Sequence, residues 1–237
     1  MKIAIIGYGK MGTEIEKIAI ERNHEIVLKI NDKNLSDFST ENLKNADVAI
    51  DFSTPKSAYG NILKCFESGV SVVAGTTGWL QNYDNAVAEC KKQKLAFFYA
   101  SNFSLGVNIF FEINKHLAKI MNKYSDYDIT IEEAHHIHKI DAPSGTAITL
   151  ANDIIKNIDR KKAWNKTNKD KNEIQISSVR EGNIPGTHTI IYDSYVDKLE
   201  IKHIAKNRQG FALGAVLAAE FIQNKNGIFD MNDLLNL

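Results

Sequence analysis

The stretch that decides the fold lies at the start of the chain and reads Lys2-Ile3-Ala4-Ile5-Ile6-Gly7-Tyr8-Gly9-Lys10-Met11-Gly12. Its first half is a short apolar run typical of a buried strand. Its second half is G-x-G-x-x-G at the start of a segment with helical apolar spacing. In this context the first glycine permits a tight turn, the second lets the backbone approach a pyrophosphate, and the third allows close helix packing. The N–H groups at the helix start favour an anion. We therefore predict a dinucleotide-binding loop made of Gly7, Tyr8, Gly9, Lys10, Met11 and Gly12, with a purely structural glycine turn as the alternative.

The same alternation of apolar run, turn and helical segment continues through the first hundred residues. The apolar runs are Ile3–Ile6, Ile26–Ile30, Val48–Ile50, Val70–Ala74 and Leu95–Tyr99. Their apolar character is continuous and does not alternate, which indicates strands that are covered on both faces, as in a parallel sheet between helices. The pattern predicts a Rossmann-type α/β domain.

Small polar residues follow several of these predicted strands. After the second strand, the carboxylate of Asp32 suits a ribose 2′-OH, whereas the neighbouring Lys33 suits a 2′-phosphate, so this position leaves NADH and NADPH both open. Ligands of open α/β sheets bind outside the carboxyl ends of the strands. Candidates to line a nicotinamide pocket therefore lie at three strand ends, Asp51–Pro55, Gly75–Gly78 and Ala100–Phe103. The residues that we assign to cofactor binding there are Gly75, Thr76, Thr77, Ala100, Ser101, Asn102 and Phe103. The alternative for each is a loop residue that serves only turn geometry.

The alternation of short apolar runs and helical segments ends at about Ser101. A long helical segment, Gly106–Met121, precedes strand-like runs at Ile129–Glu133, Glu173–Val179, Thr187–Tyr192 and Lys198–Ile204. This α+β region reads as a second domain, and the apolar helix Ala212–Ile222 is expected to pack back on the first. The predicted fold is thus α/β, with a dinucleotide-binding domain at 1–102 plus 206–237 and an inserted α+β domain at 103–205.

Two connecting segments of the second domain also carry predictions. Arg160–Lys171 has six basic residues in twelve, which we interpret as a solvated, mobile loop in preference to a nucleic-acid patch. Val179–His188 is predicted to form a hairpin between two strands, with Pro185 and Gly186 at the turn. The sequence leaves open whether Arg180 or His188 touches a ligand.

Composition narrows the class of protein. The 237 residues are 43% hydrophobic, which suits a globular chain, and 29 basic residues balance 29 acidic ones. A net charge of zero gives no overall field that would hold nucleic acid or an acidic membrane surface. No apolar stretch is long enough for a secretory signal or a membrane span. Cys65 and Cys90 show no metal or redox spacing, so we expect a reducing compartment, the cytoplasm.

The densest chemical signal is Glu132-Glu133-Ala134-His135-His136-Ile137-His138-Lys139, which holds three of the seven histidines and a lysine within five positions. A zinc site, a structural cluster of hydrogen-bonded histidines, and an acid/base site with a lysine proton donor are the three interpretations. We favour the acid/base site because neither a cysteine nor an H-E-x-x-H pattern joins the cluster. Ser144-Gly145-Thr146 then precedes an apolar-periodic segment, so it should cap a helix that favours a carboxylate or phosphate.

On these motifs the chain resembles the 4-hydroxy-tetrahydrodipicolinate reductase family, also called dihydrodipicolinate reductases. The resemblance rests on E-A-H-H-x-H-K-x-D-A-P-S-G-T, which runs from Glu133 to Thr146. Further support comes from the glycine loop, Gly75–Gly78, Ser101–Asn108, Arg180-x-Gly182 and Gly227–Met231. The resemblance implies a homotetramer that reduces a cyclic imine dicarboxylate with NADH or NADPH, and a second domain that binds substrate and forms the tetramer.

The resemblance also implies roles for single residues. His135 would be the acid/base residue and Lys139 the proton donor, whereas His136, Gly145 and Thr146 would hold substrate, and no metal is expected. The chain departs from the family at Asn31, where glutamate is common, so the resemblance does not choose between NADH and NADPH. The runner-up is another two-domain NAD(P)-dependent reductase of an amino-acid derivative, against which the His-rich motif argues. A redox sensor without catalysis would not need that motif.

Overall fold

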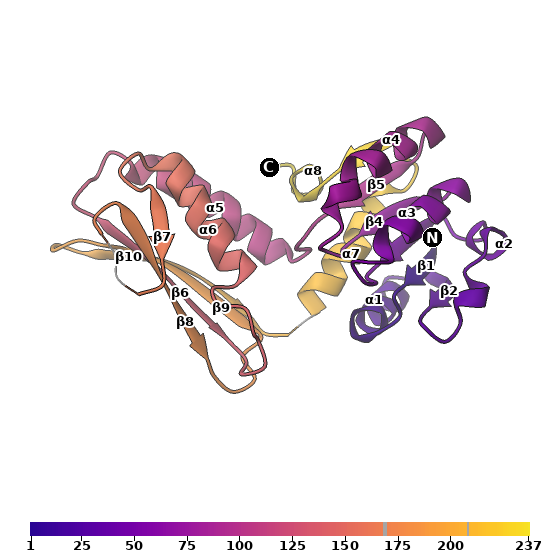
Figure 1. The fold of residues 1–237 in the computed structure, drawn as a ribbon, viewed down its shortest axis with the longest axis horizontal. Helices are drawn as coiled ribbons and strands as arrows, with labels where there is room; N and C mark the ends of the chain where they lie inside the picture. Colours follow the sequence, from indigo (N-terminus) through magenta and orange to yellow (C-terminus); the bar gives the residue numbers. More distant parts are fainter. Residues whose placement is uncertain (168–169, 208) are drawn as a thin grey trace. The chain divides into compact units, whose positions relative to one another are not determined.

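The computed structural model describes residues 1–167, 170–207 and 209–237, which form two compact units (Figure 1). Unit 1 consists of Met1–Leu105 and Arg208–Leu237, and unit 2 is Gly106–Asn207. Each unit has its own sheet. Within the described residues, no helix combines the length and the apolar character needed to cross a bilayer.

Unit 1 is built on a six-stranded sheet with the order β11-β5-β4-β3-β1-β2. Every neighbouring pair in it is parallel. The strands are β1 (Lys2–Ile6), β2 (Glu25–Ile30), β3 (Val48–Asp51), β4 (Ser71–Ala74), β5 (Ala96–Tyr99) and β11 (Gly227–Phe229). The first five lie where the apolar runs predict them, which confirms the Rossmann-type α/β class. The short β11 was not predicted.

Helices cover both faces of this sheet. They are α1 (Lys10–Glu21), α2 (Thr40–Leu43), α3 (Ala58–Glu67), α4 (Tyr83–Gln93), α7 (Gln209–Ile222) and α8 (Met231–Leu235), with short 3₁₀ turns at Leu35–Asp37 and Leu80–Asn82. On one face, Ile15 of α1 and Val216 of α7 lie in one buried cluster with Ile5 of β1. On the other face, Ile62 of α3 packs with Ala4 of β1. Burial on both faces explains the continuous apolar runs.

Unit 2 has a five-stranded mixed sheet with the order β10-β9-β6-β8-β7. The strands are β6 (Asp128–His135), β7 (Ala163–Asn165), β8 (Glu173–Arg180), β9 (Gly186–Asp193) and β10 (Lys198–Ala205). Helices α5 (Leu105–Met121) and α6 (Gly145–Asn157) cover one face (Figure 1). The core between sheet and helices includes Ile131, Ile176 and Ile190 from three strands, with Ala118 from α5 and Leu150 from α6.

The prediction of a hairpin over Val179–His188 is wrong. Strands β8 and β9 do not pair with each other, because β6 lies between them, parallel to β8 and antiparallel to β9. The segment between them bonds instead to the end of β6: the N–H of Glu181 donates to the carbonyl of His135 (2.9 Å), and the N–H of Ile137 donates to the carbonyl of Gly182 (3.2 Å). The turn residues therefore serve a crossing connection, which local sequence does not distinguish from a hairpin.

The prediction of a solvated loop over Arg160–Lys171 is correct for the exposed Lys162, Lys166 and Lys171 and wrong for β7 and for Lys161, while residues 168–169 lie outside the described residues. This segment contains β7, which pairs in parallel with β8. Lys161 is only 2% exposed. Its ammonium contacts Asp128 Oδ1 at 2.9 Å and donates to the carbonyls of Lys171 (3.0 Å) and Glu173 (2.7 Å). A buried ammonium is tolerated when its donors are satisfied in this way.

Candidate active site

The predicted cofactor residues lie at the carboxyl end of the unit 1 sheet. The N–H groups of Gly7 and Tyr8 both donate to the carbonyl of Ile30, at 3.0 and 2.7 Å, which ties the glycine loop to the end of β2. Helix α1 begins directly after Gly9, and no side chain of a described residue caps its first turn. Asp32 is exposed in the turn that follows β2. Strands β1 and β3 are neighbours in the sheet, but the chain continues from β1 to β2 on one side and from β3 to β4 on the other. Open α/β sheets bind ligands at the carboxyl ends of two such strands.

The three glycines of the loop have different surroundings. A Cβ on Gly7 would lie 2.2 Å from the carbonyl oxygen of Phe52, and φ at this position is +85°. A Cβ on Gly12 would lie 2.9 Å from the carbonyl oxygen of Gly7. Around Gly9, by contrast, a Cβ would meet nothing within 4 Å. The fold itself therefore requires glycine at positions 7 and 12. At position 9 the fold would admit a side chain, and the absence of one leaves open space at the uncapped start of α1. This arrangement fits the pyrophosphate of a dinucleotide.

Phe52, which follows β3, joins the remaining predicted cofactor residues. A Cβ on Gly75 would lie 2.2 Å from its ring, and the ring of Phe103 lies 5.6 Å from it between centroids. Thr76 is buried, and its hydroxyl donates to Asp51 Oδ1 at 2.6 Å. Of the other predicted cofactor residues at this edge, Ala100 and Phe103 are buried, Asn102 is half-buried, and Thr77 and Ser101 are exposed. Asp51 is the last residue of β3 and Phe52 follows it, so both lie at one of the strand ends where the sequence predicts a nicotinamide pocket, although neither was assigned to cofactor binding.

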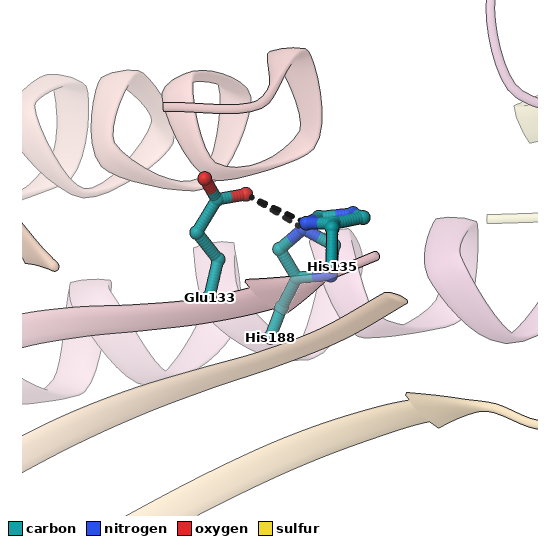
Figure 2. A group of neighbouring side chains, drawn as sticks. All are labelled: Glu133, His135 and His188. Atoms are coloured by element: carbon teal, nitrogen blue, oxygen red, sulfur yellow. Dashed lines mark ion pairs between the residues drawn. The ribbon is translucent and has the colours of Figure 1, made fainter. Parts of the chain in front are cut away.

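In unit 2, polar side chains replace apolar ones at one end of the helix-covered face of the sheet. Along β6 the inward positions are Ile129, Ile131, Glu133 and His135. Along β9 they are His188, Ile190 and Tyr192. The strand register places Glu133 opposite His188, and His135 beside Arg180 of β8. Figure 2 shows the carboxylate of Glu133 pointing toward the two imidazole rings.

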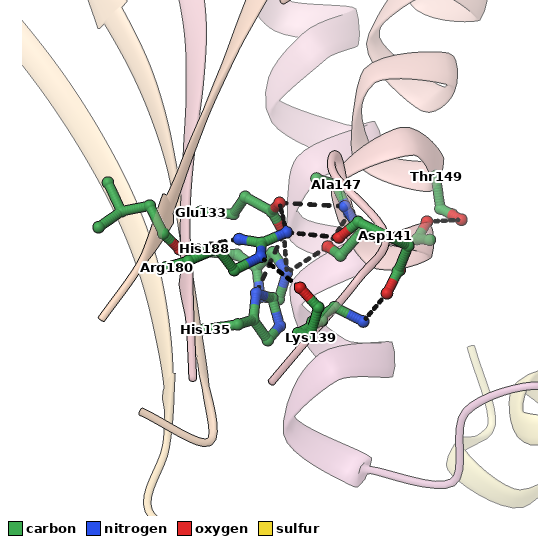
Figure 3. A network of polar contacts seen from close by, with 11 residues as sticks. Glu133, His135, Lys139, Asp141, Ala147, Thr149, Arg180 and His188 are labelled. Atoms are coloured by element: carbon green, nitrogen blue, oxygen red, sulfur yellow. Dashed lines mark hydrogen bonds and ion pairs between the residues drawn. The ribbon is translucent and has the colours of Figure 1, made fainter. Parts of the chain in front are cut away.

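Glu133 is the centre of this polar cluster (Figure 3). Its Oε1 accepts from Nη2 of Arg180 at 2.8 Å and from the N–H of Ser144 at 3.1 Å. Its Oε2 lies 3.2 Å from Nδ1 of His135 and 3.8 Å from Nε2 of His188. Burial alone would raise the pKa of Glu133, but the contacts from His135, Ser144 and Arg180 outweigh it and hold the pKa well below its usual range. Glu133 is therefore ionised.

His188 is the buried neutral member of the cluster. Its Nε2 lies 3.1 Å from the hydroxyl of Ser144, and its ring stands nearly perpendicular to that of His135, with centroids 5.1 Å apart. Burial, and next the nearby His135, lower the pKa of His188 to about 4. The sequence had left His188 and Arg180 undecided. The signal that could have found them is a polar residue that continues the inward apolar stripe of its strand.

The histidines of the dense motif separate in space. His135 ends β6 and is buried, whereas His136 is half-buried and His138 is exposed in the following turn, with their two rings 6.1 Å apart. Nζ of Lys139 contacts Asp141 Oδ1 at 2.8 Å, and this contact lowers the pKa of Asp141. The carbonyl of Lys139 accepts from Nε of Arg180 at 3.3 Å. Arg180 thus connects the loop of Lys139 to the carboxylate beside His135.

The start of α6 adjoins the same cluster. Ser144 is its N-cap, since its hydroxyl accepts from the N–H of Ala147 at 3.3 Å, which confirms the predicted cap. Gly145 is exposed with open space around it, and Thr146 is half-buried in the first turn. The first N–H groups of a helix have no acceptor within the helix and favour an anion.

Glu133, His135 and His188 also offer donor atoms within 4.8 Å of one another, a spacing that a metal ion could use. The carboxylate of this group already binds the guanidinium of Arg180, so its charge is compensated and a second cation would be repelled. We therefore interpret the three residues as a proton-handling cluster.

Two family descriptions match the chain, and together they span nearly all of it. "Dihydrodipicolinate reductase, N-terminus" matches residues 1–103, and "Dihydrodipicolinate reductase, C-terminus" matches residues 106–235.

Similar proteins are named for the same enzyme family. The chain is 53% identical, over 240 aligned residues, to a 4-hydroxy-tetrahydrodipicolinate reductase of Christiangramia forsetii, with 100% of this chain and 98% of the relative covered. It is 36% identical to the protein of that name in Wigglesworthia glossinidia brevipalpis, with coverage of 100% and 93%. A solved structure, the dipicolinate-bound dihydrodipicolinate reductase of Paenisporosarcina sp. TG-14, shares the fold with a TM-score of 0.78 at 24% identity, covering 98% of both chains.

Proposed function

The chain belongs to the dihydrodipicolinate reductase family, and from this premise we propose that it reduces 4-hydroxy-tetrahydrodipicolinate to tetrahydrodipicolinate in diaminopimelate and lysine biosynthesis. The family uses NADH or NADPH. The structural observation that carries the proposal is the presence in one chain of two parts: an open helix start at Gly9, and a buried carboxylate–imidazole pair at Glu133 and His135. The first suits a nicotinamide dinucleotide, and the second suits a reaction that moves a proton.

The residues of unit 1 would hold the cofactor. The loop Gly7–Gly12, with Tyr8, Gly9, Lys10 and Met11 between its ends, would receive the pyrophosphate at the start of α1, and Asp32 would accept from a ribose hydroxyl. Gly75, Thr76 and Thr77, together with Ala100, Ser101, Asn102 and Phe103, would shape the nicotinamide pocket. When bound, the nicotinamide supplies the hydride.

The residues of unit 2 would handle the accompanying proton and the substrate. We assign His135 as the acid/base residue and Lys139 as the proton donor. Nζ of Lys139 also contacts Oδ1 of Asp141 at 2.8 Å. His136 and the first turn of α6 at Gly145 and Thr146 would hold the two substrate carboxylates. In a chain of zero net charge, a local cation beside a helix start is what binds an anionic substrate.

The function is tested by a coupled assay with freshly generated 4-hydroxy-tetrahydrodipicolinate and each reduced cofactor in turn. We expect substrate-dependent oxidation of NADH, NADPH or both. His135→Gln should lower kcat by about 10²–10⁴-fold with little effect on cofactor affinity, because it removes an acid/base group. Absence of substrate-dependent oxidation in the wild type would contradict the function, and retention of kcat by His135→Gln would contradict the role of His135 alone.

The substrate site is tested by separating its two duties. Lys139→Ala should mainly lower kcat, because it removes a proton donor, and Thr146→Val should mainly raise KM, because it disturbs a ground-state carboxylate contact. Pyridine-2,6-dicarboxylate should compete with substrate in the wild type and bind more weakly to Thr146→Val. Equal inhibition of the two proteins would contradict the anion site without affecting the assigned reaction.

We also assign this enzyme to a homotetramer in the cytoplasm. Unit 2 presents an apolar hollow of about 430 Å³ lined by α5 and β10, which includes Ile113, Ile120 and Leu199. These three side chains are between 41% and 48% exposed, and exposed apolar patches of this kind suit contact with another copy of the chain. Cys65 and Cys90 are both free thiols, which agrees with a reducing compartment.

A further inference from the structure

Two buried polar atoms face each other at the centre of the unit 2 cluster. They are Oε2 of Glu133 and Nδ1 of His135, 3.2 Å apart. Neither has a hydrogen bond to a described residue, so the pair is close without the alignment of a full hydrogen bond. A buried polar atom that stays unpaired costs about 1–3 kcal/mol, and catalytic hydrogen bonds are often poorly aligned before substrate binds. The two atoms are therefore natural partners.

The other oxygen of the same carboxylate is already committed. Arg180 and the N–H of Ser144 both donate to Oε1, which anchors the carboxylate from β8 and from the start of α6. An ionised carboxylate only accepts hydrogen bonds, so an imidazole nitrogen that faces Oε2 favourably must carry a proton. In a neutral imidazole with the proton on Nδ1, Nε2 carries the lone pair.

We propose that Glu133 is a positioning residue that holds His135 with its proton on Nδ1, so that Nε2 is the atom that exchanges a proton with substrate. The proposal rests on the proposed function only for the identity of that substrate. It does not make Glu133 a catalytic residue, because Glu133 acts through His135.

The other charged and titratable groups around His135 are compatible with this role. His188 from β9 is held by the hydroxyl of Ser144, and its Nε2 is farther from Oε2 of Glu133, at 3.8 Å. The low pKa of His188, about 4, keeps it neutral, so it does not compete as a cation for the carboxylate. Arg180 from β8 binds the opposite oxygen. In the loop after β6, Lys139 is paired with Asp141.

Strand β9 has no side chain next to the Nε2 edge of the His135 ring, because its first residue is Gly186. A Cβ on Gly186, the first residue of β9, would lie 3.2 Å from Nε2 of His135 and 3.4 Å from its Cδ2. Contacts this short would require the ring to move. A residue without a side chain at this position therefore leaves uncovered the nitrogen that Glu133 does not face.

The test is the tautomer of His135, read by nitrogen-15 NMR of the full-length chain without substrate or cofactor. Spectra at about pH 8.5 lie above the ordinary imidazole pKa, and the His135→Gln variant identifies the signal among the seven histidines. We expect the proton on Nδ1 in the wild type. In Glu133→Gln the amide oxygen can still accept from Arg180 and Ser144, whereas its NH₂ group would face Nδ1. The proton of His135 should then move to Nε2.

Glu133→Gln should also lower kcat by about 10²–10⁴-fold while leaving the cofactor dissociation constant unchanged. The matched control is Glu132→Gln. Glu132 is the preceding residue on β6, and its exposed side chain points to the other face of the strand. This variant should change neither the tautomer nor kcat.

A wild-type His135 with its proton on Nε2 would overturn the proposal, and this measurement needs no variant to fold. An unchanged tautomer in a folded Glu133→Gln would overturn it as well. A purely structural role would lower the melting temperature of Glu133→Gln and leave the tautomer as in the wild type. If the wild type fails to reduce 4-hydroxy-tetrahydrodipicolinate, the proposed function fails, and the tautomer still decides the role of Glu133.

Discussion

Among single residues, Gly7 is required by the fold, whereas Gly9 is predicted to be required only for cofactor binding. Gly9→Val should leave the fold intact, because a Cβ there meets nothing within 4 Å, and should raise the cofactor dissociation constant at least tenfold, about 1.4 kcal/mol. Gly7→Val should instead unfold or strongly destabilise the chain, because its Cβ would lie 2.2 Å from the Phe52 carbonyl oxygen. NAD(P)H titration and thermal melts of both variants check this. An unchanged titration with folded Gly9→Val would remove the assignment of the loop.

His188 gives a prediction about acid stability. Its pKa is about 4 in the folded chain and near 6.5 when unfolded, so between these values the unfolded chain binds a proton that the folded chain does not. Stability should therefore fall as the pH falls from 6.5 to 4, by about 3 kcal/mol at most. Glu133, whose pKa is lowered, adds a loss of the same sign at more acidic pH.

Urea unfolding at pH 7, 6 and 5 measures this dependence. His188→Gln should flatten it, because the variant has no imidazole to protonate at this buried site. His138→Gln, which replaces an exposed histidine, should keep the wild-type slope. A slope that is equally steep in His188→Gln would assign the acid sensitivity to another group.

Among the elements, β7 and β8 depend on a buried lysine. Lys161→Met should destabilise the chain by about 2–3 kcal/mol, because the carbonyls of Lys171 and Glu173 would lose their donor. Lys162→Met is the matched control. Its side chain is exposed, and its effect should stay within about 0.5 kcal/mol. Urea midpoints compare the two variants, and equal midpoints would show that the burial of Lys161 does not contribute to stability.

For the whole molecule, the prediction concerns assembly through α5 and β10. Ile113→Lys places a charge in the apolar hollow and should shift the mass of the particle from a tetramer toward smaller species, as measured by light scattering after size-exclusion chromatography. Lys156→Glu, on the exposed face of α6, is the control and should keep the tetramer. A monomeric wild type would contradict the assembly itself, and an unchanged mass for Ile113→Lys would contradict this surface.

Several features of the molecule follow from the sequence alone because their causes are local. The strands of unit 1 lie on continuous apolar runs, since a strand covered on both faces cannot alternate. The glycine loop and the cap at Ser144 depend on backbone geometry within a few residues. Patterns that span only a few residues can be recognised in a single sequence. They predicted the fold class and the starts of α1 and α6.

Other features depended on contacts between residues far apart in the chain. Glu133 meets Arg180 47 positions later, and Ser144 meets His188 44 positions later. The order of strands, with β6 between β8 and β9, produces these contacts, and no turn residue between β8 and β9 encodes that order. The burial of Lys161 likewise depends on carbonyls presented by another strand. The sequence by itself therefore determined the elements and the chemical types of the site, whereas only the tertiary structure decided which side chain stands beside His135, because strand pairing is a nonlocal interaction.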